Sequence, residues 1–293
     1  MIDAHHHIWL QKDLPWLLGP ERPRIFGPYA PIKRDYRIAE YLDDLEGTGI
    51  AKSVYVQANW APNWALDEAA WVQSVADETG WPHAIVAYCD FTKPKIHRLL
   101  DKFKRFPLIR GFRQQLHWHE NPQYRFAPRD QLTDPRLADG INALAENGWS
   151  FDLQVFPDQM ADAARLAESC PDVTFILQHA GMLEDTSDAG WKSWRKGMKT
   201  LADLPNVVTK LSGFGTFIHR NDAEFIAKMV KETVKIFGPD RCMFGSNFPI
   251  EKIWTGYADL FAAFQAATAK LPAKARSAIF NDTAARVYRL EDG

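Results

Sequence analysis

The sequence predicts an α/β fold in which eight strand–helix units close into a single (β/α)8 TIM barrel. The main observation is that short apolar or β-branched runs recur along all 293 residues, each followed by a longer stretch with helical spacing. This alternation is the pattern of βα units on a parallel sheet, and eight parallel strands would close as a barrel. We find no linker, internal repeat or low-complexity tract, so we expect one domain over residues 1–293.

Eight runs are expected to be strands because each is short and rich in apolar or β-branched residues. In chain order they are Ile2–Ile8, Ala51–Gln57, Ala84–Cys89, Ile109–Gln114, Phe151–Val155, Val173–His179, Val207–Leu211 and Cys242–Ser246. The helical patterns are Ile38–Glu46, Leu66–Glu78, Lys95–Phe103, Pro135–Asn147, Asp158–Glu168, Trp191–Leu204, Ala223–Phe237 and Tyr257–Ala269. A C-terminal helical tail follows in two parts, Ala273–Phe280 and Thr283–Leu290.

Glycine and proline residues mark several boundaries between helices and strands. A Gly or Pro ends the helix that precedes four of the predicted strands. These residues are Gly49 before the second strand, Gly148 before the fifth, Pro171 before the sixth and the pair Gly238-Pro239 before the eighth. A doubly wound sheet is the alternative architecture. It is less favoured because no G-x-G-x-x-G motif follows the first strand.

Two long segments interrupt the regular spacing. Trp9–Tyr36 is rich in Pro and Trp and follows the first strand, and His117–Thr133 follows the fourth. Long irregular loops in a compact fold usually bind ligands or cover active sites. In a barrel, the loops after the strands lie on the face where active sites are found.

Composition excludes several classes of partner. Lys and Arg number 35 against 37 Asp and Glu, for a formal charge of −2, which is too balanced for binding to nucleic acid. No apolar run is long enough to span a membrane, and the start of the chain lacks a signal-peptide pattern. The three cysteines are far apart and each lies beside apolar residues. They are expected to be buried thiols, which favours a cytoplasmic location.

The first strand carries three consecutive histidines. Because side chains alternate along a strand, His5 and His7 are expected to point one way and His6 the other. A His-x-His pair on one face suits a single metal ion such as zinc. The alternative is that a run of histidines near the start of the chain arose by chance or from a shortened tag.

A further histidine, His179, stands where the sixth strand passes into its loop, in the run Leu177-Gln178-His179-Ala180-Gly181. That position lies on the face of a barrel where catalysis occurs. A lone histidine there is as often structural as functional. Together with His5 and His7 it becomes a third candidate ligand.

Motifs along the whole chain resemble the amidohydrolase superfamily, in the amidohydrolase-related branch that includes sugar-lactone hydrolases. They are D-A-H-H-H-I-W at the start, I-R-G-F-R on the fourth strand, L-Q-H-A-G on the sixth, G-P-D-R-C-M-F-G-S-N-F-P-I on the eighth and F-N-D-T-A-A-R-V-Y in the tail. The resemblance implies a (β/α)8 barrel that hydrolyses a lactone or related acyl bond. It also implies an active site of His5, His7, His179 and the residue at position 247.

This sequence departs from the superfamily pattern at the end of the eighth strand. The superfamily has Asp there as the general base, and this chain has Asn247. An amide can donate or accept a hydrogen bond but has no useful pKa for proton transfer. The fourth strand also offers no bridging Lys or Glu of the kind found in binuclear relatives, so at most one divalent metal, zinc, is expected. Other members of this branch resemble metal-free lactonases, and a metal-free site stays open.

With Asn247 unable to act as a base, another group has to activate the water. A bound zinc could do so alone, because it lowers the pKa of its water to about 7. His117 and His119 on the second long loop are further candidates, since imidazole titrates near neutral pH. Asp90, after the third strand, is another.

Five residues near the strand ends are candidates for binding substrate. Arg113 can fork onto a substrate carboxylate or ring oxygens, and Gln114, Gln57 and Gln154 could hydrogen bond to sugar hydroxyls. Trp118 lies between two histidines and could stack on a ring. Ordinary ion pairing, loop capping and core packing are the alternatives for each of them.

We therefore expect a hydrolase that opens a sugar lactone or a related carboxylated lactone with an activated water. A barrel that only binds its ligand is the main alternative, because Asn247 replaces the acid. A metal-dependent decarboxylase of the same superfamily is a further one. The expected partner is a small molecule, with no nucleic acid or membrane, and assembly into an oligomer of identical chains is a further expectation.

Overall fold

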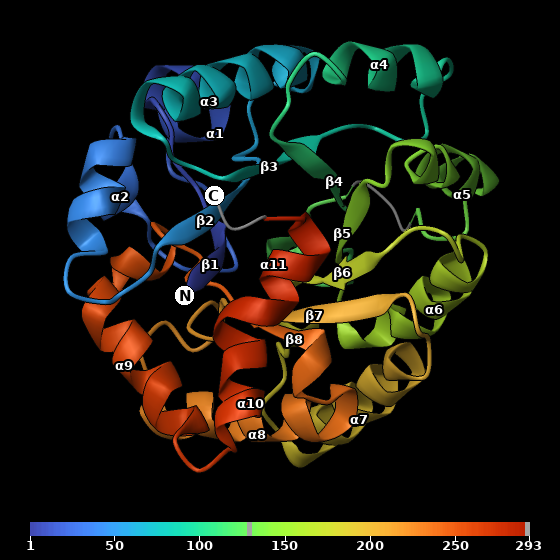
Figure 1. Ribbon diagram of the computed structural model, residues 1–293. Coiled ribbons are helices and arrows are strands. Elements are labelled where there is room, and N and C mark those ends of the chain that lie inside the picture. Colours follow the sequence, from blue (N-terminus) through green and yellow to red (C-terminus); the bar gives the residue numbers. More distant parts are fainter. Residues whose placement is uncertain (128–130, 291–293) are drawn as a thin grey trace.

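A computed structural model of the protein describes residues 1–127 and 131–290. Eight parallel strands lie side by side in sequence order and form one curved sheet (Figure 1). They are β1 (Ile2–His6), β2 (Lys52–Val56), β3 (Ala84–Tyr88), β4 (Ile109–Gln115), β5 (Ser150–Gln154), β6 (Phe175–Leu177), β7 (Val207–Leu211) and β8 (Cys242–Phe244). The predicted (β/α)8 barrel is confirmed.

The barrel closes through the segment that follows β8. His6 forms a parallel bridge with Phe248, and the His7 amide donates to the Phe248 carbonyl at 2.7 Å. The buried Asp3 carboxylate reinforces this seam, because it accepts hydrogen bonds from the backbone and hydroxyl of Ser246 at 2.8 and 2.6 Å. Two tyrosine hydroxyls, of Tyr41 and Tyr257, donate to the same carboxylate.

Helices surround the barrel as a ring (Figure 1). They are α2 (Ile38–Asp44), α3 (Ala65–Thr79), α4 (Ile96–Phe103), α5 (Pro135–Asn142), α6 (Met160–Glu168), α7 (Asp188–Ala202), α8 (Ala223–Phe237) and α9 (Tyr257–Thr268). A short α1 (Pro15–Leu18) lies in the first long loop. The tail consists of α10 (Ala273–Ser277), one wider helical turn (Ala278–Asp282) and α11 (Thr283–Tyr288).

Alternation of side chains divides the core into two layers. Tyr55, Phe112 and Phe151 point outward from their strands and pack with the helices in the larger apolar cluster. Inward-pointing residues such as Val54 and Val86 fill the barrel itself, where the tail adds Val287 and Tyr288 of α11 and Leu290 after it. The tail therefore plugs one end of the barrel.

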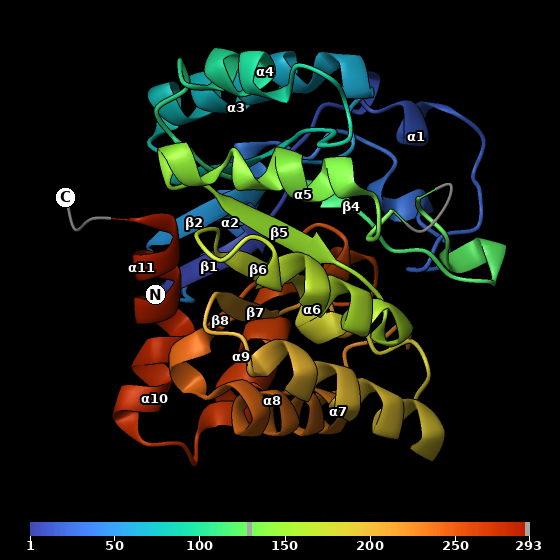
Figure 2. The same ribbon diagram turned by 90° about the vertical axis from the view of Figure 1, so that its right-hand side faces the viewer.

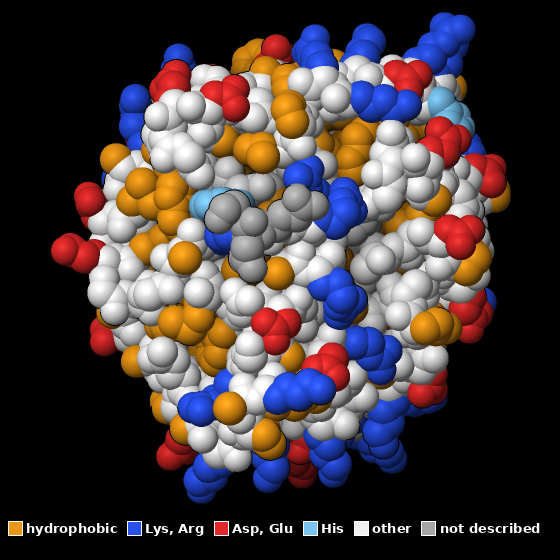
Figure 3. Space-filling view, in the orientation of Figure 1, with side chains coloured by type: hydrophobic (Ala, Val, Ile, Leu, Met, Phe, Trp, Pro, Cys, Tyr) orange, Lys and Arg blue, Asp and Glu red, His pale blue; other side chains and the backbone are white. Residues whose placement is uncertain are grey.

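The two ends of the barrel differ (Figure 2). The tail helices α10 and α11 lie at the end where the strands begin, and α1 with its long loop lies at the opposite end. On the tail-bearing face, Lys and Arg side chains are interspersed with Asp and Glu side chains (Figure 3). The opposite end, where the strands finish and the long loops lie, is the end at which barrels of this kind have their active sites.

The observed elements differ from the predicted ones mainly at their ends. Strands β6 and β8 stop at Leu177 and Phe244, before the predicted ends. After β6 the chain enters a tight turn at Gln178–Gly181. The predicted helix Pro135–Asn147 is α5 followed by a separate tight turn, Ala145–Asn147. Part of the predicted loop His117–Thr133, residues 128–130, and the last three residues of the predicted domain lie outside the described residues.

Two further sequence expectations can be compared with the structure. Cys89, Cys170 and Cys242 are buried and free, as predicted. Among the helices that the structure describes, none combines the length and the apolar character needed to cross a bilayer.

Candidate active site

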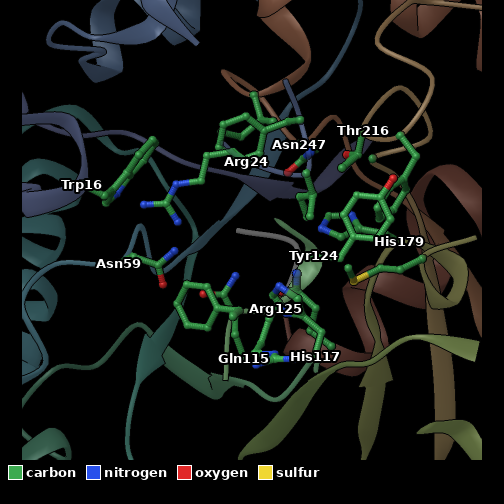
Figure 4. A pocket seen from close by; sticks show the side chains of 18 of the residues that line it. Trp16, Arg24, Asn59, Gln115, His117, Tyr124, Arg125, His179, Thr216 and Asn247 are labelled. Carbon is green, nitrogen blue, oxygen red and sulfur yellow. The ribbon is translucent and has the colours of Figure 1, made fainter. Parts of the chain in front are cut away.

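A cavity opens at the end of the barrel where the strands finish, between the two long loops. Its lining comes from strand ends and from both loops of the same chain, as Figure 4 shows. Asn247, Thr216 and His179 lie on one side of the cavity, with Trp16 and Asn59 on the other. The loop after β4 adds Tyr124, Arg125 and Phe126. The described lining residues include no Asp or Glu.

The three histidines singled out in the sequence come together at the base of this cavity. The ring of His5 lies 5.1 Å from that of His7 and 4.8 Å from that of His179, measured between centroids. His6 points to the outside of the barrel, where it stacks on Tyr41. His7 and His179 line the cavity, whereas His5 lies outside its lining.

His179 owes its position to a tight turn after β6. His179 and Ala180 both adopt left-handed backbone angles, with φ of 54° and 45°, which non-glycine residues adopt only when the surroundings hold them there. The Trp194 indole donates to the Ala180 carbonyl at 2.7 Å. Ser212 lies 2.9 Å from His179 Nδ1. Gly213 packs so closely that a Cβ would lie 2.5 Å from the same nitrogen.

The imidazoles around the cavity are neutral at physiological pH. Burial lowers the pKa of His7, His117 and His179 to about 3, and the charge of Arg113 adds to each shift. The Nδ1–H of His7 donates to the Val56 carbonyl at 2.6 Å. Because a carbonyl only accepts, His7 Nε2 keeps its lone pair and can accept a proton or hydrogen bond.

A metal centre would need three side chains with converging donor atoms. His5 Nε2 is buried and has no hydrogen-bond partner, as a ligand atom would. However, residues 1–127 and 131–290 contain no group of three His, Cys, Asp or Glu side chains arranged to hold a metal ion. Two buried cations, Arg113 and Lys210, also lie beside the imidazoles, where their positive charges would repel a metal cation. The described residues therefore show no formed metal centre.

A buried ion pair lies beneath the histidines. Lys210 Nζ on β7 is 2.8 Å from Asp152 Oδ2 on β5, and both side chains are fully buried. The ammonium also lies 3.4 Å from His5 Nδ1, and Gln178 donates to Asp152 at 2.9 Å. Removing one member would leave an unpaired charge in the interior. The sequence analysis missed this pair, although a Lys and an Asp inside otherwise apolar strands were the signal.

Arg113 is held rigidly in the wall of the cavity. Its Nη2 donates to the Gln57 carbonyl at 2.6 Å, and its Nη1 donates to Gln154 Oε1 at 3.4 Å. Burial lowers the pKa of Arg113 to about 10, so the guanidinium remains charged at neutral pH. Gln154 lines the cavity as well, whereas Gln57 contributes its backbone to Arg113 and is not among the lining residues.

The structure places several predicted residues away from the cavity. Gln114 faces outward, where its Oε1 accepts from the Phe91 amide, and its neighbour Gln115 lines the cavity instead. This follows from strand alternation once Arg113 points inward. His119 and Trp118 lie in the loop outside the lining: His119 Nδ1 accepts from the Asn121 amide, and Trp118 packs under the guanidinium of Arg125. Asp90 accepts from Thr92 and also lies outside the lining.

Other lining residues were not found from the sequence. Arg24 and Arg125 lie in the two long loops, where no periodic pattern shows which side chains turn inward. Of the loop histidines, His117 is the one that lines the cavity, and its buried Nδ1 has no hydrogen-bond partner.

Comparisons with known proteins agree with this architecture. The model of the family described as Amidohydrolase matches residues 2–290. An uncharacterized protein, y4mH, from Sinorhizobium fredii is 38% identical over 99% of this chain and 98% of its own. An L-fucono-1,5-lactonase from Burkholderia multivorans is 29% identical, covering 99% of this chain and 96% of its own.

A solved structure is similar along its whole length. It is an amidohydrolase from Burkholderia multivorans with bound zinc, 28% identical, with a TM-score of 0.84 and 99% of each chain covered. The eight-stranded barrel, the histidines at its mouth and the match over nearly the full length lead to one conclusion. The chain belongs to the amidohydrolase family.

Proposed function

We propose that this protein hydrolyses a lactone that carries a carboxylate group. It is a hydrolase of the amidohydrolase family, and its relatives include lactonases that act on a cyclic ester. The observation that supports the carboxylate is the charge of the cavity: Arg24, Arg113 and Arg125 line it, and no acidic side chain is among its described lining residues. A planar guanidinium matches a carboxylate in charge and geometry.

We assign the steps of lactone hydrolysis to groups that line this cavity. Water attacks the ring carbonyl carbon, the ring C–O bond breaks, and the proton released by the water ends on the departing oxygen. We assign the charged Arg113 to stabilise the negative charge that develops on the carbonyl oxygen. We assign the lone pair of His7 Nε2 to accept the proton of the water, because the Val56 carbonyl fixes this tautomer.

His179, Asn247 and His117 line the same cavity, and we retain them as the groups around the attacking water. Asn247 provides an amide that orients the water. His119 lies outside the lining, so it is not part of this proposal. A lactone has a tethered ester leaving group and demands less acid catalysis than an amide.

The first experiment is a proton-release assay on two kinds of lactone. The panel compares the neutral L-fucono-1,5-lactone with lactones that carry a free carboxylate, such as glucaro-1,4-lactone and muconolactone. We expect the carboxylated lactones to be hydrolysed with the higher kcat/KM. A neutral lactone as the better substrate would overturn the assignment of the arginines, and inactivity on the whole panel would favour the binding-protein alternative.

Arg24→Gln tests the carboxylate directly. A charge-assisted hydrogen bond contributes about 1.5–3 kcal/mol, so KM for the carboxylated lactone should rise by about 10- to 100-fold. KM for a neutral lactone should change little. Arg22→Gln is the matched control, because Arg22 is exposed in the same loop and lies outside the lining. Equal effects on both kinds of substrate would contradict the proposal.

Chelation separates this route from the zinc that the sequence predicts at His5, His7 and His179. We expect activity to survive treatment with a chelator, because the proposed route uses side chains alone. Loss of activity on chelation and recovery with zinc would assign the three imidazoles to a metal and overturn this part of the proposal.

A further inference from the structure

A buried carboxylic acid, Glu251, lies next to Asn247 on the side away from the cavity. Asn247 follows β8 with a left-handed φ of 57°, a conformation that Asn tolerates better than most residues. The backbone N–H of Asn247 donates to the His5 carbonyl at 2.7 Å. The backbone carbonyl of Asn247 accepts from the backbone N–H of Glu251 at 3.2 Å. This backbone hydrogen bond closes a turn after β8 and brings residue 251 back beside residue 247.

The Glu251 carboxyl is only partly satisfied. Its Oε2 accepts a hydrogen bond from the Trp254 indole at 3.0 Å, whereas its Oε1 is buried without a hydrogen-bond partner of good geometry. The Asn247 side chain lies beside the same carboxyl and lowers its pKa. Gly215 makes the space for this carboxyl, because a Cβ at that position would collide with Oε2.

Glu251 lies outside the cavity lining, and Asn247 lies within it. The side chain of Asn247 therefore lies between the Glu251 carboxyl and the cavity. Charged and titratable side chains on the surrounding segments are turned to other partners. Lys252 is paired with Glu40 and Asp44, His219 lies 3.0 Å from the Ile25 carbonyl, and Lys33 donates to the Gly19 carbonyl.

We propose that Glu251 is a positioning residue that sets the orientation of the Asn247 amide in the cavity. An ionised carboxylate only accepts hydrogen bonds, so it holds the Nδ2–H of Asn247 and leaves Oδ1 facing the cavity. Oδ1 then accepts a hydrogen bond from the attacking water. A protonated carboxyl donates instead, which turns Oδ1 away and places Nδ2 toward the cavity. The role of the water rests on the proposed lactone hydrolysis, whereas the amide orientation does not.

This arrangement makes the orientation depend on pH. Burial raises the pKa of Glu251 to about 7, with the Trp254 and Asn247 side chains acting in the opposite direction. The productive orientation is therefore present above about pH 7 and is lost as the pH falls. Hydrolysis should rise between pH 6 and pH 8 for this reason.

The test that needs no substrate follows the Asn247 side-chain amide by NMR in protein labelled at asparagine. The resonance is identified by its absence in Asn247→Ser. In the wild type we expect it to shift between pH 5.5 and 8.5 with a midpoint near 7, and in Glu251→Gln we expect no such shift. Glu184→Gln is the matched control, because burial also raises the pKa of Glu184 to about 7 and Glu184 lies outside the lining.

A second variant tests the same carboxyl if Glu251→Gln fails to fold. Trp254→Phe removes the indole donor that lowers the pKa of Glu251, so the midpoint of the Asn247 signal should move to higher pH. An Asn247 signal with no midpoint in this range, or one that persists in Glu251→Gln, would overturn the proposal whether or not any lactone is hydrolysed.

Activity gives an independent readout on the lactone that the panel identifies. Misplacement of a group in an active site can lower the rate by about 100-fold, so kcat of Glu251→Gln should fall by about that factor while KM stays within about twofold. Its rate should also lose the rise between pH 6 and pH 8. A variant with a normal rate and pH profile would show that Glu251 is structural.

Discussion

At the scale of single residues, the site depends on close contacts that hold side chains in unusual positions. His179 has a left-handed backbone, and Gly213 is the residue that leaves room for its ring. Arg113 is fixed by the Gln57 carbonyl and the Gln154 amide. These contacts orient groups before substrate arrives, which is the condition for electrostatic stabilisation of a transition state.

Gly213→Ala tests this preorganisation. Gly213 has a φ of +64°, and a Cβ there would lie 2.5 Å from His179 Nδ1. We expect kcat to fall by about 100-fold because the imidazole is displaced, and stability to fall by about 1–2 kcal/mol because alanine disfavours this backbone conformation.

The matched control for this prediction is Gly47→Ala. Gly47 has a similar φ of +74°, with nothing within 4 Å of an added Cβ. It should show the loss of stability in urea unfolding while kcat stays unchanged. Equal kcat values for the two variants would mean that the position of His179 does not matter to turnover.

At the scale of elements, buried polar groups connect helices to strands. Glu68 on α3 is buried, and its Oε1 accepts both from the Tyr55 hydroxyl on β2 at 2.7 Å and from the Ala58 amide at 2.6 Å. This carboxyl fixes the end of β2 against its helix. Burial raises its pKa to about 7, although both donors lower it.

Glu68 should make stability depend on pH. Because the folded-state pKa lies above the unfolded value near 4.5, its contribution is full below pH 4.5 and is lost as the pH rises through 7. Glu68→Gln keeps an oxygen for both donors and cannot ionise. Between pH 6 and 8.5, the wild type should therefore lose about 1 kcal/mol more unfolding free energy than this variant.

Urea unfolding at the two pH values provides the measurement. Glu46→Gln, at an exposed position, is the matched control and should behave as the wild type does. An identical loss in the wild type and Glu68→Gln would show that another group is responsible for the pH dependence.

At the scale of the whole molecule, one buried carboxylate joins the first strand to the last. Asp3 on β1 accepts from Ser246 after β8, from Tyr41 on α2 and from Tyr257 on α9. His5 and Asn247 lie on the same seam, where the backbone N–H of Asn247 donates to the His5 carbonyl. Barrel closure and assembly of the site therefore depend on the same residues.

Asp3→Ala should weaken the entire fold. It leaves three buried hydroxyls and two backbone amides without their acceptor, and loss of a buried network partner costs about 3–5 kcal/mol. The unfolding free energy from a urea titration provides the measurement. Asp43→Ala, at an exposed position on α2, should change stability by no more than about 0.5 kcal/mol. Similar values for the two variants would show that the seam contributes little.

The sequence by itself determined the features that depend on local periodicity. Alternating strand and helix patterns predicted the barrel, and the period of two along β1 predicted that His5 and His7 share a face away from His6. The position of His179 at a strand end predicted that it joins them. The roles of these residues remain predictions. The motifs indicated the family because they are distributed along the whole chain.

Only the tertiary structure decided the contacts between distant segments. Lys210 meets Asp152 across the barrel, the long loops turn Arg24 and Arg125 into the cavity, and the turn after β8 places Glu251 behind Asn247. Periodicity specifies which face of an element is buried, but it does not specify which residues meet there or how an irregular loop folds. Those outcomes depend on the packing of the whole chain, because each partner becomes a neighbour only after the barrel closes.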